Sequence, residues 1–262
     1  MKNALDPATW RDALREPGYP SHLLQICDSD EMVVAGAGYF AAEGLRQGQA
    51  VLLTGTRPHL EGIRGVLRTL GADPDAAERN AQLFVGDAME AVNAVMVDGL
   101  PDRDRFEAVA SEAIGKAKAD PRYRGVRWWG EMSNVFHQLG KEKAVAIDEE
   151  AGDYVCRKHN VALLCSFQLD RFDPASYEGA MQTLCDHHDH VMPGRDSPRE
   201  RNAVYQAIAE VVGPIEGRNL QSLHAWRSPC QMPQWQSMLL WVRDTMPERL
   251  PAVLKAARGY AG

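Results

Sequence analysis

Two alternating patterns of hydrophobic and polar residues run through the first two-thirds of the chain. Short apolar runs alternate with longer segments in which apolar residues recur at helical spacing. This alternation predicts an α/β fold, a mostly parallel sheet with helices on both faces. The runs predict strands at 22–27, 50–56, 82–86, 124–130 and 161–169, and the longer segments predict helices at 30–46, 58–71, 104–119, 144–159 and 174–190.

The pattern changes after Pro193. The stretch MPGRDSPRE is rich in turn-forming residues and predicts a linker. The residues after it predict a helical extension, with helices at 198–212, 233–245 and 248–258, whose prolines suit helix starts. We therefore predict an N-terminal helical arm at 1–19, an α/β domain at 20–192 and a C-terminal helical extension at 193–262.

Charge and composition narrow the possible functions. The chain has 262 residues and a net charge of −7, and its Lys and Arg residues are scattered, so we expect no direct nucleic-acid binding. It has neither a membrane-length apolar run nor an apolar N-terminal signal, so we expect a cytoplasmic protein that does not bind membranes. The five cysteines form no C-x-x-C pair, and a disulfide framework is therefore not expected.

The first predicted strand ends in an acidic turn with the sequence CDSDE. In nucleotide-binding proteins this strand-to-helix turn holds glycines and a lysine that cradle phosphate. Here it holds Asp28, Asp30 and Glu31, and no G-x-x-x-x-G-K-[ST] motif occurs in the chain. The aspartates can be helix N-caps or can contact a ligand. Small residues in AGAG at 35–38 indicate close helix–sheet packing, not a phosphate loop.

A second unusual stretch is GVRWWGEM at 125–132. Glu131 follows a predicted strand, at the edge where ligands of open α/β sheets bind. It can be a general base, a ligand anchor or a cap for the segment 132–139. Arg127 is expected to pair with an acid near the same edge, and His22, which begins its strand, is expected at the opposite edge in a structural role. The predicted ligand site therefore consists of Asp28, Glu31, Arg127 and Glu131.

The segment CDHHDH at 185–190 is a candidate metal site. Its possible ligands are Cys185, His187, His188 and His190, several of which share a helix face. The alternative is a solvated helix end. A cation held by Asp28, Glu31 and Glu131 is a further hypothesis, and no cofactor is predicted.

Several separated pieces of the chain follow one another in a specific order: His22, Gly44-Leu45 with Gly48, Gln82-Leu83, Arg127 with Gly130-Glu131-Met132, Glu149 or Glu150, Leu164-Cys165 and Arg171-Phe172. Together these pieces resemble the MEDS domain, a sensory family named after regulators of methanogens and methylotrophs. That family is similar to the KaiC/RecA ATPase core with its nucleotide motifs eroded. This chain departs from the family pattern with Phe167 in place of a usual Tyr, Ala81 in place of a usual Gly, and CDHHDHVMP where a His-Pro pair is usual.

The resemblance implies a non-catalytic cytoplasmic regulatory protein. It would sense a small organic molecule at the former nucleotide site and could contact a regulatory protein partner through the C-terminal helices. One alternative is an enzyme, either a metal-dependent hydrolase that uses Glu131 or a cryptic KaiC-like ATPase. Another is a protein-interaction scaffold.

Overall fold

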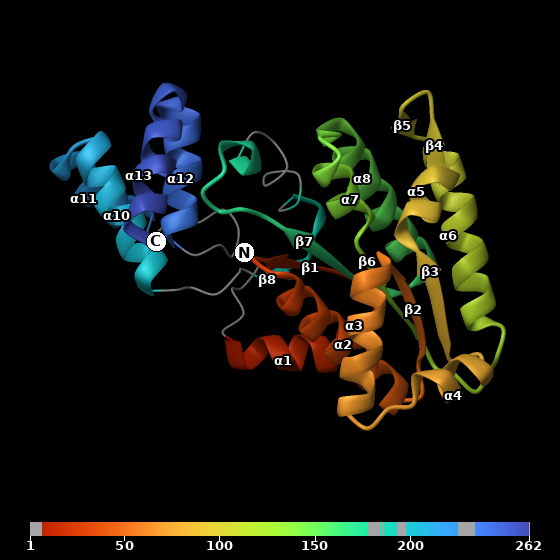
Figure 1. The fold of residues 1–262 in the computed structure, drawn as a ribbon. Helices are drawn as coiled ribbons and strands as arrows, with labels where there is room; N and C mark the ends of the chain where they lie inside the picture. Colours follow the sequence, from red (N-terminus) through yellow and green to blue (C-terminus); the bar gives the residue numbers. More distant parts are fainter. Residues whose placement is uncertain (1–6, 178–183, 185, 193–197, 225–233, 262) are drawn as a thin grey trace.

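A six-stranded parallel sheet forms the centre of the molecule (Figure 1). The computed structural model describes residues 7–177, 184, 186–192, 198–224 and 234–261. Within these residues the strand order is β3-β2-β6-β7-β1-β8, so the predicted α/β class is confirmed. The strands are β1 (Ser21–Cys27), β2 (Ala50–Gly55), β3 (Leu83–Asp87), β6 (Val126–Gly130), β7 (Ala162–Gln168) and β8 (His190–Met192), and a small hairpin pairs β4 (Met96–Val97) with β5 (Leu100–Pro101).

Helices cover both faces of the sheet because alternate strand residues point to opposite faces. Leu23 and Leu53 pack on one helical layer, whereas Leu24 and Leu52 pack on the other. The first layer contains α1 (Pro7–Arg15), α2 (Asp30–Arg46), α3 (Arg57–Thr69) and α4 (Pro74–Arg79). The second contains α5 (Ala88–Val95), α6 (Arg103–Lys118), α7 (Met132–Gln138) and α8 (Glu142–His159).

Glycines on α2 allow that helix to lie close to the sheet. A Cβ on Gly36 would stand 2.1 Å from Oε1 of Gln25 in β1, and one on Gly44 would stand 2.7 Å from Cδ of Arg127 in β6. Both distances are below van der Waals contact, so a larger residue at either position would push the helix away. The interpretation of AGAG as a packing motif is confirmed at Gly36.

The C-terminal helices form a bundle beside the sheet (Figure 1). It consists of α10 (Pro198–Val211), α11 (Pro214–His224), α12 (Gln234–Thr245), η2 (Pro247–Arg249) and α13 (Leu250–Ala261), so the predicted helical extension is confirmed. The predicted helix at 174–190 is wrong in part, because residues 174–177 form the 3-10 helix η1 (Pro174–Tyr177) and residues 190–192 form β8. The three-part division at 19 and 192 stays a prediction.

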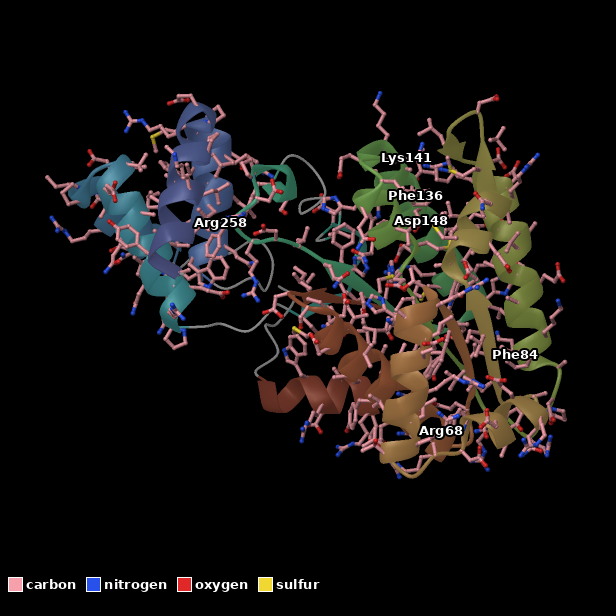
Figure 2. All side chains as sticks on the ribbon, viewed as in Figure 1. Arg68, Phe84, Phe136, Lys141, Asp148 and Arg258 are labelled. Carbon is pink, nitrogen blue, oxygen red and sulfur yellow. The ribbon has the colours of Figure 1, made fainter. Side chains whose placement is uncertain are left out.

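The segment that follows β7 joins this bundle to the α/β part. Oε2 of Glu200 accepts a 2.6 Å hydrogen bond from Nη1 of Arg171. Nη1 of Arg243 donates to the Tyr177 carbonyl at 2.9 Å. Arg258 lies on the bundle (Figure 2). Its Nη2 is 2.7 Å from Oδ2 of Asp170. A change at the end of β7 can therefore reach the bundle through direct contacts.

In the described part of the chain, every helix is too short or too polar to cross a membrane.

Candidate functional site

Glu131 lies at the carboxyl edge of the sheet, where the sequence places it, but its carboxylate is already bonded. The side chain is 1% exposed. Its Oε1 accepts a 2.5 Å hydrogen bond from the Thr56 backbone N–H, and its Oε2 lies 2.6 Å from Nδ1 of His59. The hydrogen bond with Glu131 raises the pKa of His59 against the opposing effect of burial. The carboxylate thus holds the first turn of α3.

The acidic turn is likewise occupied by internal partners. The N-cap of α2 is Ser29, whose hydroxyl accepts from the Met32 N–H, so the prediction that an aspartate caps this helix is wrong. Asp28 pairs with Arg171. Asp30 accepts a 2.6 Å hydrogen bond from Nε2 of Gln168, which lowers its pKa. Glu31 is exposed in the first turn of α2.

Arg127 lies near the amino end of β6, whereas Glu131 follows the carboxyl end of the same strand. Arg127 is the second residue of β6, and the prediction that it stands at a strand carboxyl end is therefore wrong. Its buried guanidinium donates to the backbone carbonyls of Leu14, Arg15 and Phe40 at 2.5, 2.6 and 3.1 Å. Burial lowers its pKa. These bonds fasten α1 and α2 to the sheet, and the four predicted ligand residues do not form one group.

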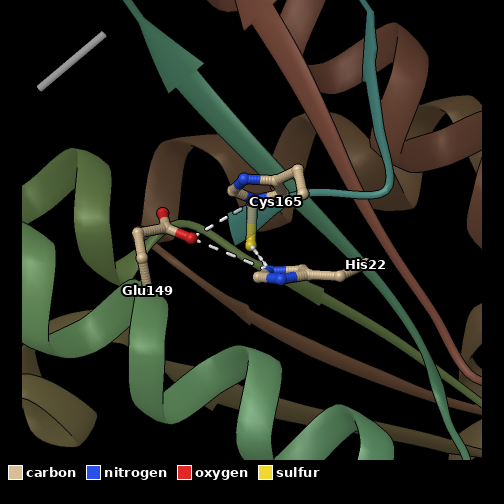
Figure 3. A group of neighbouring side chains, drawn as sticks. His22, Glu149 and Cys165 are labelled. Atoms are coloured by element: carbon tan, nitrogen blue, oxygen red, sulfur yellow. Dashed lines mark hydrogen bonds and ion pairs between the residues drawn. The ribbon is translucent and has the colours of Figure 1, made fainter. Parts of the chain in front are cut away.

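A different set of side chains converges beneath α8. His22 from β1, Glu149 from α8, Cys165 from β7 and His188 from the segment before β8 place one donor atom each within 4.8 Å of all the others. We call these four residues the buried quartet. Figure 3 shows three of them directed toward one another between α8 and the sheet. His22, Glu149 and His188 are each at most 1% exposed.

Strand register brings two members of the buried quartet, His22 and Cys165, close together. β1 and β7 are neighbours, and Cys165 pairs with Leu24, two residues beyond His22 on the same face of the sheet. Nε2 of His22 lies 3.3 Å from Sγ of Cys165. His188 is positioned by reciprocal bonds between the next residue and β1: the His22 N–H donates to the Asp189 carboxylate at 2.9 Å, and the Asp189 N–H donates to the His22 carbonyl at 2.8 Å.

The rings of the two histidines are oriented by backbone carbonyls. Nδ1 of His22 lies 2.9 Å from the His187 carbonyl, and Nδ1 of His188 lies 2.6 Å from the Leu184 carbonyl. Because a carbonyl only accepts, each Nδ1 carries the proton and each Nε2 of the neutral ring presents a lone pair. Both Nε2 atoms lie near Oε2 of Glu149, at 3.8 Å from His22 and 3.3 Å from His188.

Burial shifts the ionisation of the neighbouring acids. Loss of solvent raises the pKa of Asp148 to about 7 and, with the nearby Asp148 charge, the pKa of Glu149 to about 8. Burial also raises the pKa of the Cys165 thiol well above its usual value. At the rim of the group, burial opposes ionisation of Asp153, but hydrogen bonds from His22 and Arg157 outweigh it and lower the Asp153 pKa to about 2.

A small internal cavity of about 30 Å³ extends from the quartet toward the carboxyl edge. Asp148, which lies on α8 (Figure 2), forms part of its wall. Asp148 Oδ1 and both carboxylate oxygens of Glu149 have no hydrogen-bond partner among the described residues. The lining residues are His22, Thr54, Phe106, Trp128, Gly130, Glu131, Met132, Ser133, Asp148, Glu149, Gly152, Leu163, Cys165 and Ser166.

The candidate metal segment at 185–190 contributes one side chain to the quartet. His188 is that member, whereas His187 contributes its backbone carbonyl to His22. His190 begins β8 opposite Leu23, which faces the other helical layer. Cys185 lies outside the described residues. Among the described residues, the acids of the carboxyl edge do not form a comparable group of metal donors.

Reasoning from position in the sequence alone missed the other three members of the buried quartet, His22, Glu149 and Cys165. His22 was expected to be structural because it begins its strand, yet its side chain turns under α8 toward Cys165 and Glu149. The family resemblance did include His22, Cys165 and the choice between Glu149 and Glu150. The structure distinguishes these two acids, because Glu149 is buried and Glu150 is exposed and pairs with Arg103.

Comparison with known families agrees with this architecture. Residues 21–183 match the model of the MEDS family, described as the methanogen/methylotroph, DcmR sensory domain. The match covers more than half of the chain, and the chain belongs to this family of sensory domains. A search of curated proteins gives no match.

Proposed function

We propose that this MEDS-family chain is a non-catalytic sensory protein that binds a small, neutral, hydrogen-bonding organic molecule in the cavity beside the buried quartet. The observation that carries the proposal is the set of unbonded oxygens on Asp148 and Glu149 in the cavity wall. Buried polar atoms nearly always have partners, and leaving one without a partner costs about 1–3 kcal/mol. A bound molecule with donor and acceptor groups would supply the missing hydrogen bonds.

The size and polarity of the cavity limit the class of ligand. A volume of about 30 Å³ holds roughly two water molecules, which is the scale of a one- or two-carbon alcohol or amide. Phe106, Trp128 and Met132 give apolar wall surface for a short hydrocarbon part. Burial raises the pKa of Asp148 to about 7 and that of Glu149 to about 8 because it opposes negative charge at this place, so a neutral ligand is favoured over an anion.

This location refines the site expected from the sequence. The predicted ligand residues Asp28, Glu31 and Arg127 do not line the cavity, whereas Glu131 does. Its charge is already engaged by Thr56 and His59, and we therefore assign it to the cavity wall, not to ligand anchoring. The same engagement makes Glu131 a poor general base, which favours sensing over the hydrolase alternative.

The output of the sensor is proposed to pass through β7 to the C-terminal bundle. Cys165 and Ser166 of β7 line the cavity, and Arg171 beyond the strand end contacts both Asp28 and Glu200. The guanidinium of Arg171 also lies 5.9 Å from the ring centre of Trp235 in α12. A regulatory protein partner in the cytoplasm would then recognise the bundle.

The test is binding of defined small molecules to the full chain in the presence of a chelator. Methanol, ethanol and acetamide are compared with formate and acetate, and binding is followed by the NMR signal of the Trp128 indole N–H. We expect saturable shifts with a neutral compound and weaker or no shifts with the anions. The shifts should be lost in Glu149→Met, which removes the hydrogen-bonding oxygens, and kept in the exposed control Glu150→Gln.

Absence of saturable shifts with every neutral compound, or equal loss in Glu150→Gln, would contradict the proposed cavity site. Native mass spectrometry of the purified chain provides an independent measurement, because a retained ligand appears as added mass that Glu149→Met should lack.

A further inference from the structure

We propose that the buried quartet of His22, Glu149, Cys165 and His188 binds a divalent transition-metal cation of borderline softness, with Zn²⁺ as the best fit. This inference goes beyond the proposed sensing of an organic molecule and does not depend on it. It rests on the separations of the donor atoms, the orientation of the two imidazole rings and the balance of charge.

The separations match those of a tetrahedral zinc site. Zn–N, Zn–O and Zn–S bonds of about 2.0–2.3 Å place neighbouring ligand atoms about 3.4–3.6 Å apart in a tetrahedron. Nε2 of His22 lies 3.3 Å from Sγ of Cys165 and 3.8 Å from Oε2 of Glu149. Nε2 of His188 lies 3.3 Å from the same Oε2. All four donor atoms lie within 4.8 Å of one another, so small side-chain movements would complete a tetrahedron around a cation.

Both histidines are already oriented as metal ligands. A metal-binding histidine commonly donates its second ring N–H to a carbonyl or carboxylate, which fixes the tautomer. Nδ1 of His22 is 2.9 Å from the His187 carbonyl and 3.6 Å from Oδ1 of Asp153, and Nδ1 of His188 is 2.6 Å from the Leu184 carbonyl. These contacts leave both Nε2 lone pairs facing the position where the cation would sit.

The donor set neutralises a divalent cation. Two neutral imidazoles, one carboxylate and one thiolate carry a total charge of −2, so a bound dication forms a neutral group. Charge balance is needed because the site is buried and an isolated charge there is costly. Entry of the cation displaces the Cys165 thiol proton and any proton on Glu149 to solvent. It would also give partners to the Glu149 oxygens, which have no hydrogen bond among the described residues.

The mixture of donors selects the class of metal. A thiolate disfavours Mg²⁺ and Ca²⁺, which require oxygen ligands, whereas imidazole, thiolate and carboxylate together suit Zn²⁺ and Co²⁺. A cluster made only of acids at the carboxyl edge would have the opposite preference. Selectivity for zinc and cobalt over magnesium is therefore part of the proposal.

Cobalt provides the direct test, because tetrahedral Co²⁺ has intense visible bands and a Co²⁺–thiolate bond adds a near-ultraviolet charge-transfer band. The reduced full chain is stripped with a chelator and titrated with Co²⁺, then with Zn²⁺ as competitor. We expect both bands to saturate at one equivalent, to disappear when Zn²⁺ is added and to persist in excess Mg²⁺.

Variants assign the ligands, with circular dichroism as a check of folding. Cys165→Ser should lose the charge-transfer band, and Glu149→Gln should bind Co²⁺ at least about tenfold more weakly. Two control variants should bind Co²⁺ as the wild type does. Cys156→Ser removes a buried thiol of α8 that is not in the quartet, and Glu150→Gln changes the acid next to Glu149. Cys185→Ser tests the thiol that comes three residues before His188 in the sequence, and it should also keep the band.

Three results would overturn the proposal: no tetrahedral spectrum at one equivalent, a charge-transfer band that survives Cys165→Ser, or a band that is lost in Cys185→Ser instead. If folding of Cys165→Ser fails, the stoichiometry and Zn²⁺ competition of the wild type decide the matter. Binding of organic molecules is measured in chelator, so failure of the metal proposal and failure of the sensing proposal give different results.

Discussion

The carboxyl edge of the sheet and the space beneath α8 both contain buried acids, but their acids are in opposite states. At the edge, Glu131 accepts from the Thr56 N–H and lies against His59. Beneath α8, Glu149 is equally buried, yet its two oxygens have no hydrogen-bond partner among the described residues. The edge acid stabilises the fold, whereas the interior acid costs folding free energy.

This contrast indicates where a bound ligand would add hydrogen bonds without breaking existing ones. An acid that already has two partners must lose them before it can bind a ligand, and that loss offsets the new contacts. An acid without partners gains hydrogen bonds from any suitable ligand. Functional sites often lower the stability of the fold that contains them. The carboxyl edge is thus structural in this chain, and the interior contains the candidate site.

The largest expected effect is at the edge. Glu131→Gln removes the charge that supports two short hydrogen bonds, so we expect the free energy of unfolding to fall by about 2 kcal/mol in a denaturant titration. The matched control is Glu112→Gln on α6, an exposed acid paired with Lys116, which should unfold like the wild type. An unchanged stability of Glu131→Gln would mean that the edge acid is available for a ligand.

The same measurement beneath α8 should give the opposite sign. Glu149→Met keeps the side-chain length and removes the unbonded oxygens, so in metal-free protein we expect the free energy of unfolding to stay the same or rise by about 1 kcal/mol. The variant should lose binding of both cobalt and small molecules. A fall of more than about 1 kcal/mol would show that Glu149 supports the fold and would break the comparison.

The fold could be predicted largely from hydrophobic spacing because the strands β1, β2 and β7 are short runs of mostly apolar residues. The misses have local causes. β8 has three residues within a His-rich segment, too short for a visible pattern. α11 begins at Pro214, between the helices predicted at 198–212 and 233–245, where the sequence analysis predicts no helix although proline suits a first helical turn.

The site could be predicted less well because it depends on tertiary register. The pairing of Leu24 with Cys165 brings that thiol near His22, and this pairing is not visible in the sequence. One signal was available: Asp148 and Glu149 continue the apolar stripe of α8 that includes Val145 and Ala151, where charged residues are unusual. Acids on the buried face of an amphipathic helix are a better indicator of a site than acids in an exposed turn.

A smaller effect is expected in the pH dependence of stability. The groups that face His59 are Glu131 and Asp30, and the hydrogen bond with Glu131 raises the His59 pKa above its usual value of 6.5. Since the folded-state pKa is raised, the contribution is fully present below pH 6.5 and is lost as pH rises through the folded-state value. The difference in unfolding free energy between wild type and His59→Gln should therefore decrease with rising pH. A difference that is constant or increases across this range would contradict the paired geometry.

The smallest expected effect is that of nucleotides on the full chain. At the start of α2, the hydroxyl of Ser29 occupies the capping position that a phosphate would need, and Asp30 and Glu31 add negative charge to the first turn. Since the turn also lacks a lysine, a triphosphate would meet repulsion at the edge that is filled by internal bonds. We expect no heat of binding and no thermal shift with millimolar ATP or GTP and magnesium. The variant Asp30→Asn, which removes one charge but keeps the Ser29 cap, should also show none. A micromolar dissociation constant in calorimetry would mean that the carboxyl edge binds nucleotides. The two regions would then differ in the class of ligand that they bind, and not in whether their acids are available for a ligand.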